Sequence, residues 1–353
     1  MERITVELPA NSYDICIENG LFARMGGLLR RQTAGSKALV VTDATVDVLY
    51  GKTLVESGMA AGLQVTKIVI PTGEASKSLA MLGELYRGFA DAGLTRGDLV
   101  IAFGGGVVGD LAGFAAATYL RGIPYVQIPT TLLAQIDSSV GGKTAINLPQ
   151  GKNLAGAFYQ PAAVLIDPAF LDSLPPRVLR DGMAEAVKYG AIADRDLFEQ
   201  LAGYRSREDF LRQAERVIAI CCRIKRDVVE EDEKDTGRRM ILNFGHSIGH
   251  AIEQVYQYQT YTHGEAVAMG MAQITEHSER IGLSRPGTTA RIQAALRGLG
   301  LPLRPAVWDK TALLAAMARD KKNTSDGLQL VVLPEIGRAD VIRVGLDAVA
   351  AWL

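Results

Sequence analysis

The chain has 353 residues, of which 48% are apolar and 22% charged, and its formal net charge is −1. This length exceeds what one compact core usually holds, so it predicts about two domains. The near-neutral charge disfavours a nucleic-acid-binding or anionic-membrane-binding protein, because those partners need a net basic surface.

The N-terminal segment has no basic flank followed by an apolar core, so we expect no secretion signal. Segment 99–120 is apolar, but it holds several glycines and Asp110, which favours a buried strand, turn and helix over a bilayer helix. The cysteines Cys16, Cys221 and Cys222 form neither a disulfide framework nor a CxxC pair. Together these features predict a cytoplasmic protein with reduced thiols.

The first half alternates strand and helix patterns. Strands are predicted at residues 37–42, 64–70, 98–103 and 124–128, and helices at residues 46–61, 78–92 and 109–119. Apolar strands separated by helices indicate a mostly parallel, Rossmann-like sheet that is covered on both faces. Segments 4–8 and 13–17 are expected as an antiparallel addition at its edge.

Beyond residue 167 the helical period dominates. Helices are predicted at residues 178–191, 209–229, 247–256, 265–280, 289–298 and 311–319, and a short strand at residues 328–333. The sequence therefore predicts an α/β domain over residues 1–167 and a mostly α-helical domain over residues 168–353.

A glycine-rich loop, GGGVVGD at residues 104–110, follows a predicted strand and opens a predicted helix. Glycines let a backbone approach a phosphate, and a helix N-terminus offers free N–H groups, so a dinucleotide pyrophosphate would fit there. The alternative is a tight turn that needs positive φ. The spacing also differs from the GxGxxG of an ordinary Rossmann domain.

Three smaller loops follow neighbouring strands. Asp43 ends the first parallel strand, TGEASK at residues 72–77 follows the second, and Thr130 and Thr131 follow the strand that ends at residue 128. Each is more often a helix cap or a turn. Together they lie at the carboxyl ends of successive strands, where open α/β sheets bind ligands.

The four histidines are His246, His250, His263 and His277. His246 and His250 are spaced i,i+4, so one helical face can present both, and His263 follows closely. Candidate carboxylates are Glu185, Glu253 and Glu265. This set favours a divalent-metal site over caps and packed polar groups, and its spacing leaves open whether His246 or His250 is the ligand. His277, in a polar helix, is expected at the surface.

Isolated cations lie beside glycine, asparagine or aromatic residues. They are Lys143, Lys152, Lys188, Lys225, Arg239, Lys321 and Lys322. Most lysines are solvated surface groups, but as a set these cations could neutralise a carboxylate and a phosphate on a substrate.

Several stretches carry a resemblance to a known family. They are PTGEASKS, GGGVVGDLAGFAA, PTTLLAQIDSSVGGKTAIN, GKNLAGAFYQP, DGMAEAVKYG, LNFGHSIGHAIE, HGEAVAMGM and DKKN. In their order and spacing the chain resembles the 3-dehydroquinate synthase family over nearly its whole length. The resemblance implies that family's two-domain fold, an NAD-binding first domain, and a second domain that binds metal and substrate.

The resemblance also implies a reaction. The family, which belongs to the lyases, converts 3-deoxy-D-arabino-heptulosonate 7-phosphate to 3-dehydroquinate and phosphate in the shikimate pathway of aromatic amino acid biosynthesis. The steps are a transient NAD-dependent oxidation, phosphate elimination, reduction and an intramolecular aldol closure. The expected partners are a small phosphorylated sugar acid and a second copy of the chain, as a homodimer, in which Arg121 reaches the partner's phosphate site.

Carried over residue by residue, the resemblance implies that Glu185, His246 and His263 bind zinc or cobalt(II). It also implies that His250 is a catalytic residue rather than a metal ligand. The implied substrate and catalytic residues are His250, Lys152, Asn153, Lys188, Lys225, Arg239, Asn243 and one of Lys321 or Lys322. The implied NAD site comprises Asp43, Thr72, Gly73, Glu74, Lys77, Gly105, Gly106, Val107, Val108, Gly109, Asp110, Thr130, Thr131, Asp137, Lys143, Lys152, Phe170, Leu171, Asp172 and Ser173.

The sequence departs from the family pattern at two points. Thr72 stands where the family often has aspartate, with no tyrosine before Lys77, and Ser247 replaces a usual threonine. The alternatives are another sugar-phosphate cyclase, such as a 2-deoxy-scyllo-inosose or valiolone synthase, a metal-dependent polyol dehydrogenase, and a non-catalytic nucleotide-binding protein. The family context of Lys152, Arg239 and His250 favours the dehydroquinate reaction.

Overall fold

A computed structural model describes residues 1–318, 327–345 and 347–353. Contacts divide the chain into two compact units, which we call unit 1 (Met1–Leu174 and Lys225–Lys234) and unit 2 (Pro175–Ile224 and Asp235–Leu353). The predicted division after residue 167 places residues 225–234 in the second domain, whereas the contacts group them with unit 1.

Unit 1 contains a seven-stranded sheet with the order β1-β2-β9-β6-β5-β3-β4. Its strands are β1 (Glu2–Val6), β2 (Tyr13–Ile17), β3 (Lys37–Asp43), β4 (Gln64–Ile70), β5 (Leu99–Gly104), β6 (Tyr125–Pro129) and β9 (Ala163–Ile166). Every neighbouring pair is parallel except β1 and β2. The mostly parallel sheet is confirmed. The predicted antiparallel addition holds for β1 only, because β2 runs parallel to β9, a strand that was not predicted.

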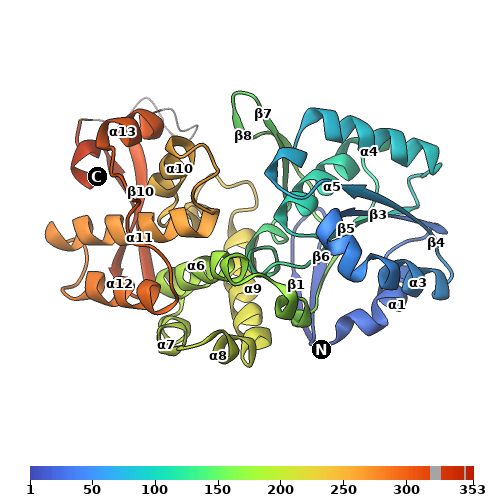
Figure 1. The fold of residues 1–353 in the computed structure, drawn as a ribbon, viewed down its shortest axis with the longest axis horizontal. Coiled ribbons are helices and arrows are strands. Elements are labelled where there is room, and N and C mark those ends of the chain that lie inside the picture. The colour runs from blue at the N-terminus through green and yellow to red at the C-terminus, as the bar shows by residue number, and fades with distance from the viewer. Residues whose placement is uncertain (319–326, 346) are drawn as a thin grey trace. The chain divides into compact units, whose positions relative to one another are not determined.

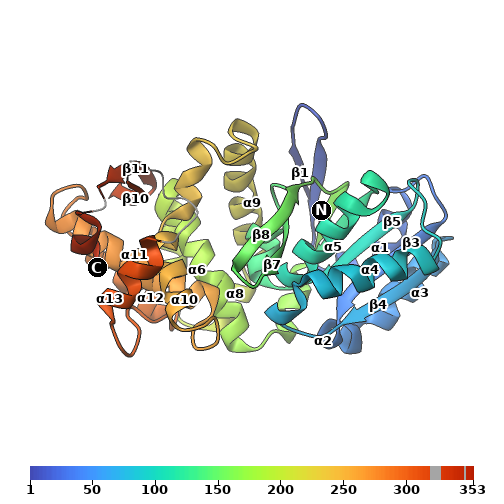
Figure 2. The ribbon, with the colours of Figure 1, turned by 90° about the horizontal axis from the view of Figure 1, so that it is seen from above.

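Helices cover both faces of this sheet (Figures 1 and 2). They include α1 (Met25–Arg30) and α3 (Lys52–Ala60) on one face and α4 (Leu79–Asp91) and α5 (Gly106–Thr118) on the other. Alternate strand residues enter the two cores: Val40 packs in the same core as Leu54, and Val41 in the same core as Leu85. Because both faces are buried there, the strands β3, β5 and β9 are almost continuously apolar.

The remaining elements of unit 1 are shorter. They are η1 (Leu21–Arg24), α2 (Ala44–Val46), the π-helical η2 (Asp47–Gly51), η3 (Glu74–Ser76), η4 (Tyr119–Arg121), the π-helical η5 (Ala134–Ser138), η6 (Pro168–Ser173) and the hairpin of β7 (Lys143–Leu148) and β8 (Gly151–Phe158). The predicted helix 46–61 is therefore interrupted by a π-helical turn. The hairpin was not predicted.

Unit 2 is mostly helical, as expected. Its elements are α6 (Pro176–Ala193), α7 (Arg195–Gly203), α8 (Arg207–Leu211), α9 (Ala214–Glu231, which continues into unit 1), η7 (Arg238–Asn243), α10 (His246–Val255), α11 (His263–Arg280), α12 (Thr288–Gly298), α13 (Lys310–Ala318), β10 (Leu328–Glu335), β11 (Arg338–Val344) and η8 (Val349–Trp352). Helix α11 packs against α6, α10 and α12 (Figure 1). The sequence did not predict α7 and β11, and residues 209–229 form parts of two helices.

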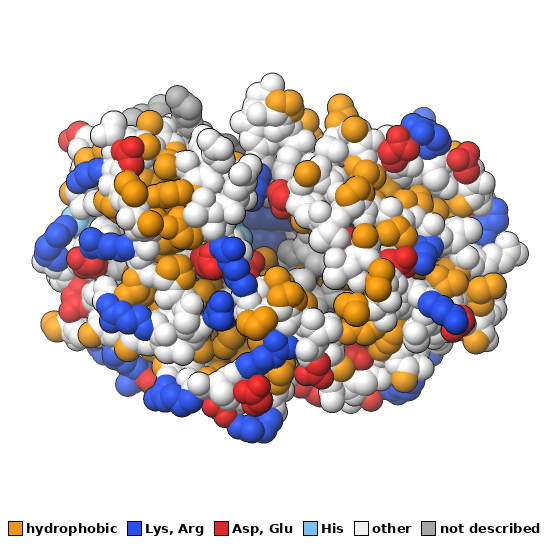
Figure 3. All heavy atoms as spheres, viewed as in Figure 1, with side chains coloured by type: hydrophobic (Ala, Val, Ile, Leu, Met, Phe, Trp, Pro, Cys, Tyr) orange, Lys and Arg blue, Asp and Glu red, His pale blue; other side chains and the backbone are white. Residues whose placement is uncertain are grey.

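Three further observations concern burial, surface charge and the apolar character of the helices. His277 is buried, with its ring centroid 4.4 Å from that of Trp352, so the expectation that it lies at the surface is wrong. Basic and acidic side chains are interspersed on the face in Figure 3. Among the described residues, no helix combines the length and apolar character needed to cross a bilayer.

Candidate metal centre and nucleotide site

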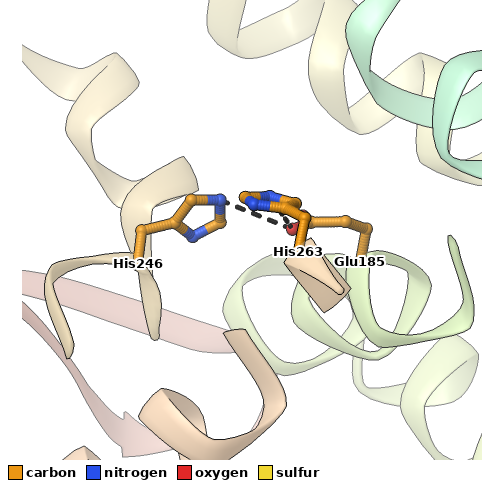
Figure 4. A group of neighbouring side chains, drawn as sticks. All are labelled: Glu185, His246 and His263. Atoms are coloured by element: carbon orange, nitrogen blue, oxygen red, sulfur yellow. Dashed lines mark ion pairs between the residues drawn. The ribbon is translucent and has the colours of Figure 1, made fainter. Parts of the chain in front are cut away.

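Three potential metal ligands converge inside unit 2. Glu185 comes from α6, and His246 and His263 are the first residues of α10 and α11 (Figure 4). Nε2 of His246 lies 3.4 Å from Oε1 of Glu185, and Nε2 of His263 lies 3.3 Å from the same oxygen. Two imidazoles and one carboxylate, with ligand atoms within 4.8 Å of one another, form a donor set that suits zinc with an open position.

Glycines allow the two histidine-bearing helices to approach each other. A Cβ on Gly270 of α11 would lie 2.0 Å from the carbonyl oxygen of Gly245, which precedes α10. Gly245 itself has φ of 81°, a left-handed conformation that favours glycine. A capping box of Thr262 and Glu265 begins α11 at His263. These local features bring the two helix N-termini, and thus both imidazoles, to Glu185.

The second ring nitrogen of each histidine faces an acceptor. Nδ1 of His246 lies 3.1 Å from the carbonyl oxygen of Phe244, and Nδ1 of His263 lies 3.3 Å from Oε2 of buried Glu253. Acceptors at Nδ1 favour the tautomer that carries its proton there, which leaves the lone pair of Nε2 for a metal. Both rings are therefore oriented as ligands.

The Glu185 carboxylate is buried, and neither oxygen accepts a hydrogen bond from the described residues. Lys188, one turn along α6, forms an ion pair with Oε2, while Oε1 faces the two imidazoles. Lys188 offsets the charge at Oε2, whereas Oε1 faces two imidazole nitrogens and is the oxygen left for a further cation. The three residues thus fit a divalent metal.

The carboxylates of Glu253 and Glu185 also control the pKa of His263. Burial alone lowers the pKa of His263, but Glu253 and Glu185 more than offset this effect and raise it well above 6.5. A metal that binds this ring has to displace a proton that the site itself favours.

The other candidates of the metal motif have different partners. Glu265 caps α11 and binds Arg177 through contacts of 2.8 and 2.7 Å. The ring centroid of His250 lies 5.4 Å from that of His246, so His250 borders the centre. His250, Glu253 and His263 form a second group of possible ligands. Since Glu253 already faces Nδ1 of His263, it is better placed to orient a ligand than to be one.

In unit 1, the glycine loop forms the N-terminus of α5. The helix begins at Gly106 after the N-cap Gly105, three residues earlier than predicted, and no side chain caps it. Gly104, Gly105, Gly106 and Gly109 are absent from the residues with positive φ, so the alternative of a positive-φ turn is wrong. These glycines are instead closely packed: a Cβ on Gly104 would meet Val108 Cγ2 at 2.6 Å. The uncapped N–H groups at Gly106, Val107 and Val108 suit an anion.

Asp43, at the carboxyl end of β3, has one occupied and one available oxygen. Oδ1 accepts hydrogen bonds from the backbone of Thr45 and Val46 and from Thr72 Oγ1, at 2.9, 3.2 and 3.1 Å. Oδ2 accepts none from the described residues and lies 3.3 Å from the position of a Cβ on Gly104. Asp43 can therefore cap α2 through Oδ1 and still offer Oδ2 to the hydroxyl groups of a ribose. Thr131 has a capping role too, since its Oγ1 accepts from Ala134 N.

Lys77 links the loop after β4 to two other segments of unit 1. Its Nζ donates to Asp110 Oδ2 at 2.7 Å and to Asn153 Oδ1. Burial raises the pKa of Asp110, and Lys77 opposes that rise. Glu74, in the same loop, accepts a 2.7 Å hydrogen bond from Asn147, a residue that was not among the candidates.

The remaining candidates divide between the units. Lys225 lies in unit 1, where it donates to the Asp137 carbonyl at 2.6 Å and pairs with its carboxylate. Lys188 and Arg239 are buried in unit 2, and Asn243 ends η7. Phe170 and Leu171 are core residues, so only their backbone could contact a nucleotide.

Further candidates are partly or fully exposed on unit 1: Gly73, Arg121, Lys143, Lys152, Asp172 and Ser173. Lys321 and Lys322 fall outside the described residues.

Comparison with protein families gives two adjoining matches. Residues 67–181 match the model of the 3-dehydroquinate synthase N-terminal family, and residues 182–323 match the C-terminal one. A 3-dehydroquinate synthase of Clostridium acetobutylicum is 48% identical over 344 residues, which cover 98% of this chain and 97% of the relative.

Two solved structures share the fold. ValA, a 2-epi-5-epi-valiolone synthase from Streptomyces hygroscopicus subsp. jinggangensis with NAD⁺ and Zn²⁺ bound, is 30% identical, with a TM-score of 0.88 and coverage of 98% and 97% of the two chains. A 2-deoxy-scyllo-inosose synthase complexed with carbaglucose-6-phosphate, NAD⁺ and Co²⁺ is 26% identical, with a TM-score of 0.86 and coverage of 99% and 98%.

Proposed function

The chain belongs to the 3-dehydroquinate synthase family, and on that premise we propose that it converts 3-deoxy-D-arabino-heptulosonate 7-phosphate to 3-dehydroquinate and phosphate. The observation that carries this proposal is the convergence of Glu185, His246 and His263 in a chain that is 48% identical to a relative of that name over 98% of its length. The enzyme is a lyase of aromatic amino acid biosynthesis.

The proposed cofactors are NAD and a divalent metal, zinc or cobalt(II). The two related synthases contain NAD⁺ with Zn²⁺ or Co²⁺. Glu185, His246 and His263 would hold the metal, and the α5 N-terminus, Asp43 and the loop from Thr72 to Lys77 would hold NAD. When bound, the metal would polarise a substrate hydroxyl, and NAD would supply reversible hydride transfer at the carbon that bears this hydroxyl.

The residues of the chain itself would bind the substrate and move its protons. Lys152, Arg239 and Lys225 would place positive charge around the carboxylate and phosphate, where preorganised cations stabilise developing negative charge. His250, beside the metal ligands, would hold or transfer a proton during elimination. Asn153, Asn243 and Lys188 complete the proposed substrate set.

Several wider assignments belong to the same proposal. Residues 1–167 would bind NAD, and residues 168–353 would bind metal and substrate. The active form would be a cytoplasmic homodimer, in which exposed Arg121 approaches the partner's phosphate site. Asp137 and Lys143 would lie where cofactor and substrate meet.

An assay of phosphate and NADH distinguishes the proposal from its alternatives. The 48% identity to a 3-dehydroquinate synthase exceeds the 30% and 26% to the other cyclases, which favours the dehydroquinate reaction. With the heptulosonate phosphate, NAD⁺ and zinc, we expect phosphate release without net NADH. Accumulation of NADH would favour a polyol dehydrogenase, and absence of any turnover would favour a binding protein.

A further inference from the structure

The hairpin of β7 and β8 has an irregular register where it carries two proposed substrate residues. The pairs Ile146–Ala155 and Leu148–Gly151 flank the irregularity, so Asn147 alone faces residues 152–154. Asn153 sits in this bulge with φ of 53°, in the left-handed region that few residues other than glycine and asparagine adopt. Bulges commonly redirect side chains next to active sites.

The side chain of Asn147 replaces the missing ladder hydrogen bond. Its Oδ1 accepts from the backbone N–H of Asn153 at 2.9 Å, and its Nδ2 donates to Glu74 Oε1 at 2.7 Å. Its own backbone N–H donates to the Lys77 carbonyl at 2.8 Å rather than to β8. One residue therefore connects the bulge to the loop that contains Glu74 and Lys77.

Lys77 closes the same arrangement from the other side, because its ammonium binds both Asn153 Oδ1 and Asp110 Oδ2. The side chain and the backbone of Asn153 thus have separate partners, Lys77 and Asn147. The conformation of the bulge depends on both.

We propose that Asn147 is a positioning residue, which holds the Lys152–Asn153 bulge in its substrate-binding conformation and ties it to the NAD-binding loop. This inference rests on the proposed function for the roles of Lys152, Asn153 and Glu74. Asn147 itself would act through its contacts with Glu74, Lys77 and Asn153. Its two ends have different tasks: Oδ1 fixes the substrate side and Nδ2 the cofactor side.

The inference predicts distinct effects for two substitutions. Asn147→Ala should lower kcat/KM by about 10- to 100-fold, since a small displacement of binding groups is costly to turnover. Asn147→Asp keeps an acceptor for the Asn153 N–H but places a carboxylate against Glu74. It should therefore weaken NAD binding while it retains the KM for the sugar phosphate. Gln150→Ala, an exposed change in the turn of the same hairpin, is the matched control and should resemble the wild type.

A double-mutant cycle and amide hydrogen exchange test the inference. If Asn147 acts through Asn153, the effects of Asn147→Ala and Asn153→Ala on kcat/KM should be less than additive. Exchange at residues 151–155 should rise in Asn147→Ala, at an unchanged melting temperature, and stay low in Asn147→Asp. Additive effects, or unchanged exchange in Asn147→Ala, would overturn the inference. Because exchange needs no substrate, an inactive wild type would refute the proposed function without deciding the role of Asn147.

Discussion

Nδ1 of His263 lies 3.3 Å from Oε2 of Glu253, while Nε2 of the same ring lies 3.3 Å from Oε1 of Glu185. One imidazole thus joins a buried acceptor on α10 to a buried carboxylate on α6. Spacing in the sequence made Glu185 and Glu253 equal candidates for the metal ligand. The structure places Glu185 among the ligand atoms and Glu253 behind His263, so we expect metal affinity to depend on both.

Glu253→Ala should weaken zinc binding by about 10- to 100-fold, because the ring of His263 loses the acceptor that fixes its tautomer and orientation. Competition with a chelator of known affinity measures this change. Glu276→Gln is the control: it removes the Arg304 ion pair further along the same helix, and should leave metal affinity unchanged. Wild-type affinity in Glu253→Ala would show that Glu253 only packs.

Two histidine substitutions should separate metal binding from proton transfer. His263→Ala removes a ligand, so both zinc content and turnover should fall to background. His250→Ala leaves the three ligands intact, so it should retain zinc and lose turnover. Elemental analysis beside the phosphate assay measures both properties. Loss of zinc in His250→Ala with retention in His263→Ala would reverse the assignment.

The raised pKa of His263 predicts opposite pH trends for the metal-free and metal-loaded protein. In the metal-free protein, the protonated ring contributes stability that is complete below its unfolded pKa, about 6.5, and is lost as pH rises through the higher folded value. Zinc needs the neutral ring, so zinc affinity should instead rise over the same interval. Melting temperatures of wild type and His263→Gln from pH 5 to 9, with and without zinc, measure both. A metal-free difference that grows with pH would contradict this sign.

The glycines before α5 predict a packing defect rather than a backbone defect. Gly104→Ala would place a Cβ 2.6 Å from Val108 Cγ2, so it should destabilise the protein by about 1–3 kcal/mol. Gly27→Ala in α1, with no atom within 4 Å of the new Cβ, should be neutral or slightly stabilising. Urea unfolding compares the two variants, and equal stabilities would contradict the close packing.

The outcome for these glycines shows where sequence reasoning was sufficient and where it was not. The motif correctly predicted a strand followed by a helix, because apolar runs and glycine breaks are local signals. Only the alternative explanation, a turn with positive φ, was wrong, and the close packing of Gly105 against Thr131 was not visible because those residues are distant in the chain. The burial of His277 against Trp352 was unpredictable for the same reason, because the two residues are far apart in the chain.

At the metal centre, residue types and helical spacing indicated a site but could not choose between His246 and His250. That choice came from the family resemblance, and the arrangement of Nε2 atoms around Glu185 supports it. The hairpin of β7 and β8, and with it Asn147, was not predicted. Both strands are partly exposed, and β8 contains two glycines, so they lack the continuous apolar pattern that revealed the sheet.

The central claim is tested most directly by the fate of phosphate and NADH in one reaction. Purified protein is mixed with 3-deoxy-D-arabino-heptulosonate 7-phosphate, NAD⁺ and zinc, and inorganic phosphate and absorbance at the NADH band are followed together. We expect one phosphate per substrate consumed, formation of 3-dehydroquinate, no net NADH, and no reaction after chelation of the metal. Stoichiometric NADH, or no phosphate release from zinc-loaded protein, would contradict the account.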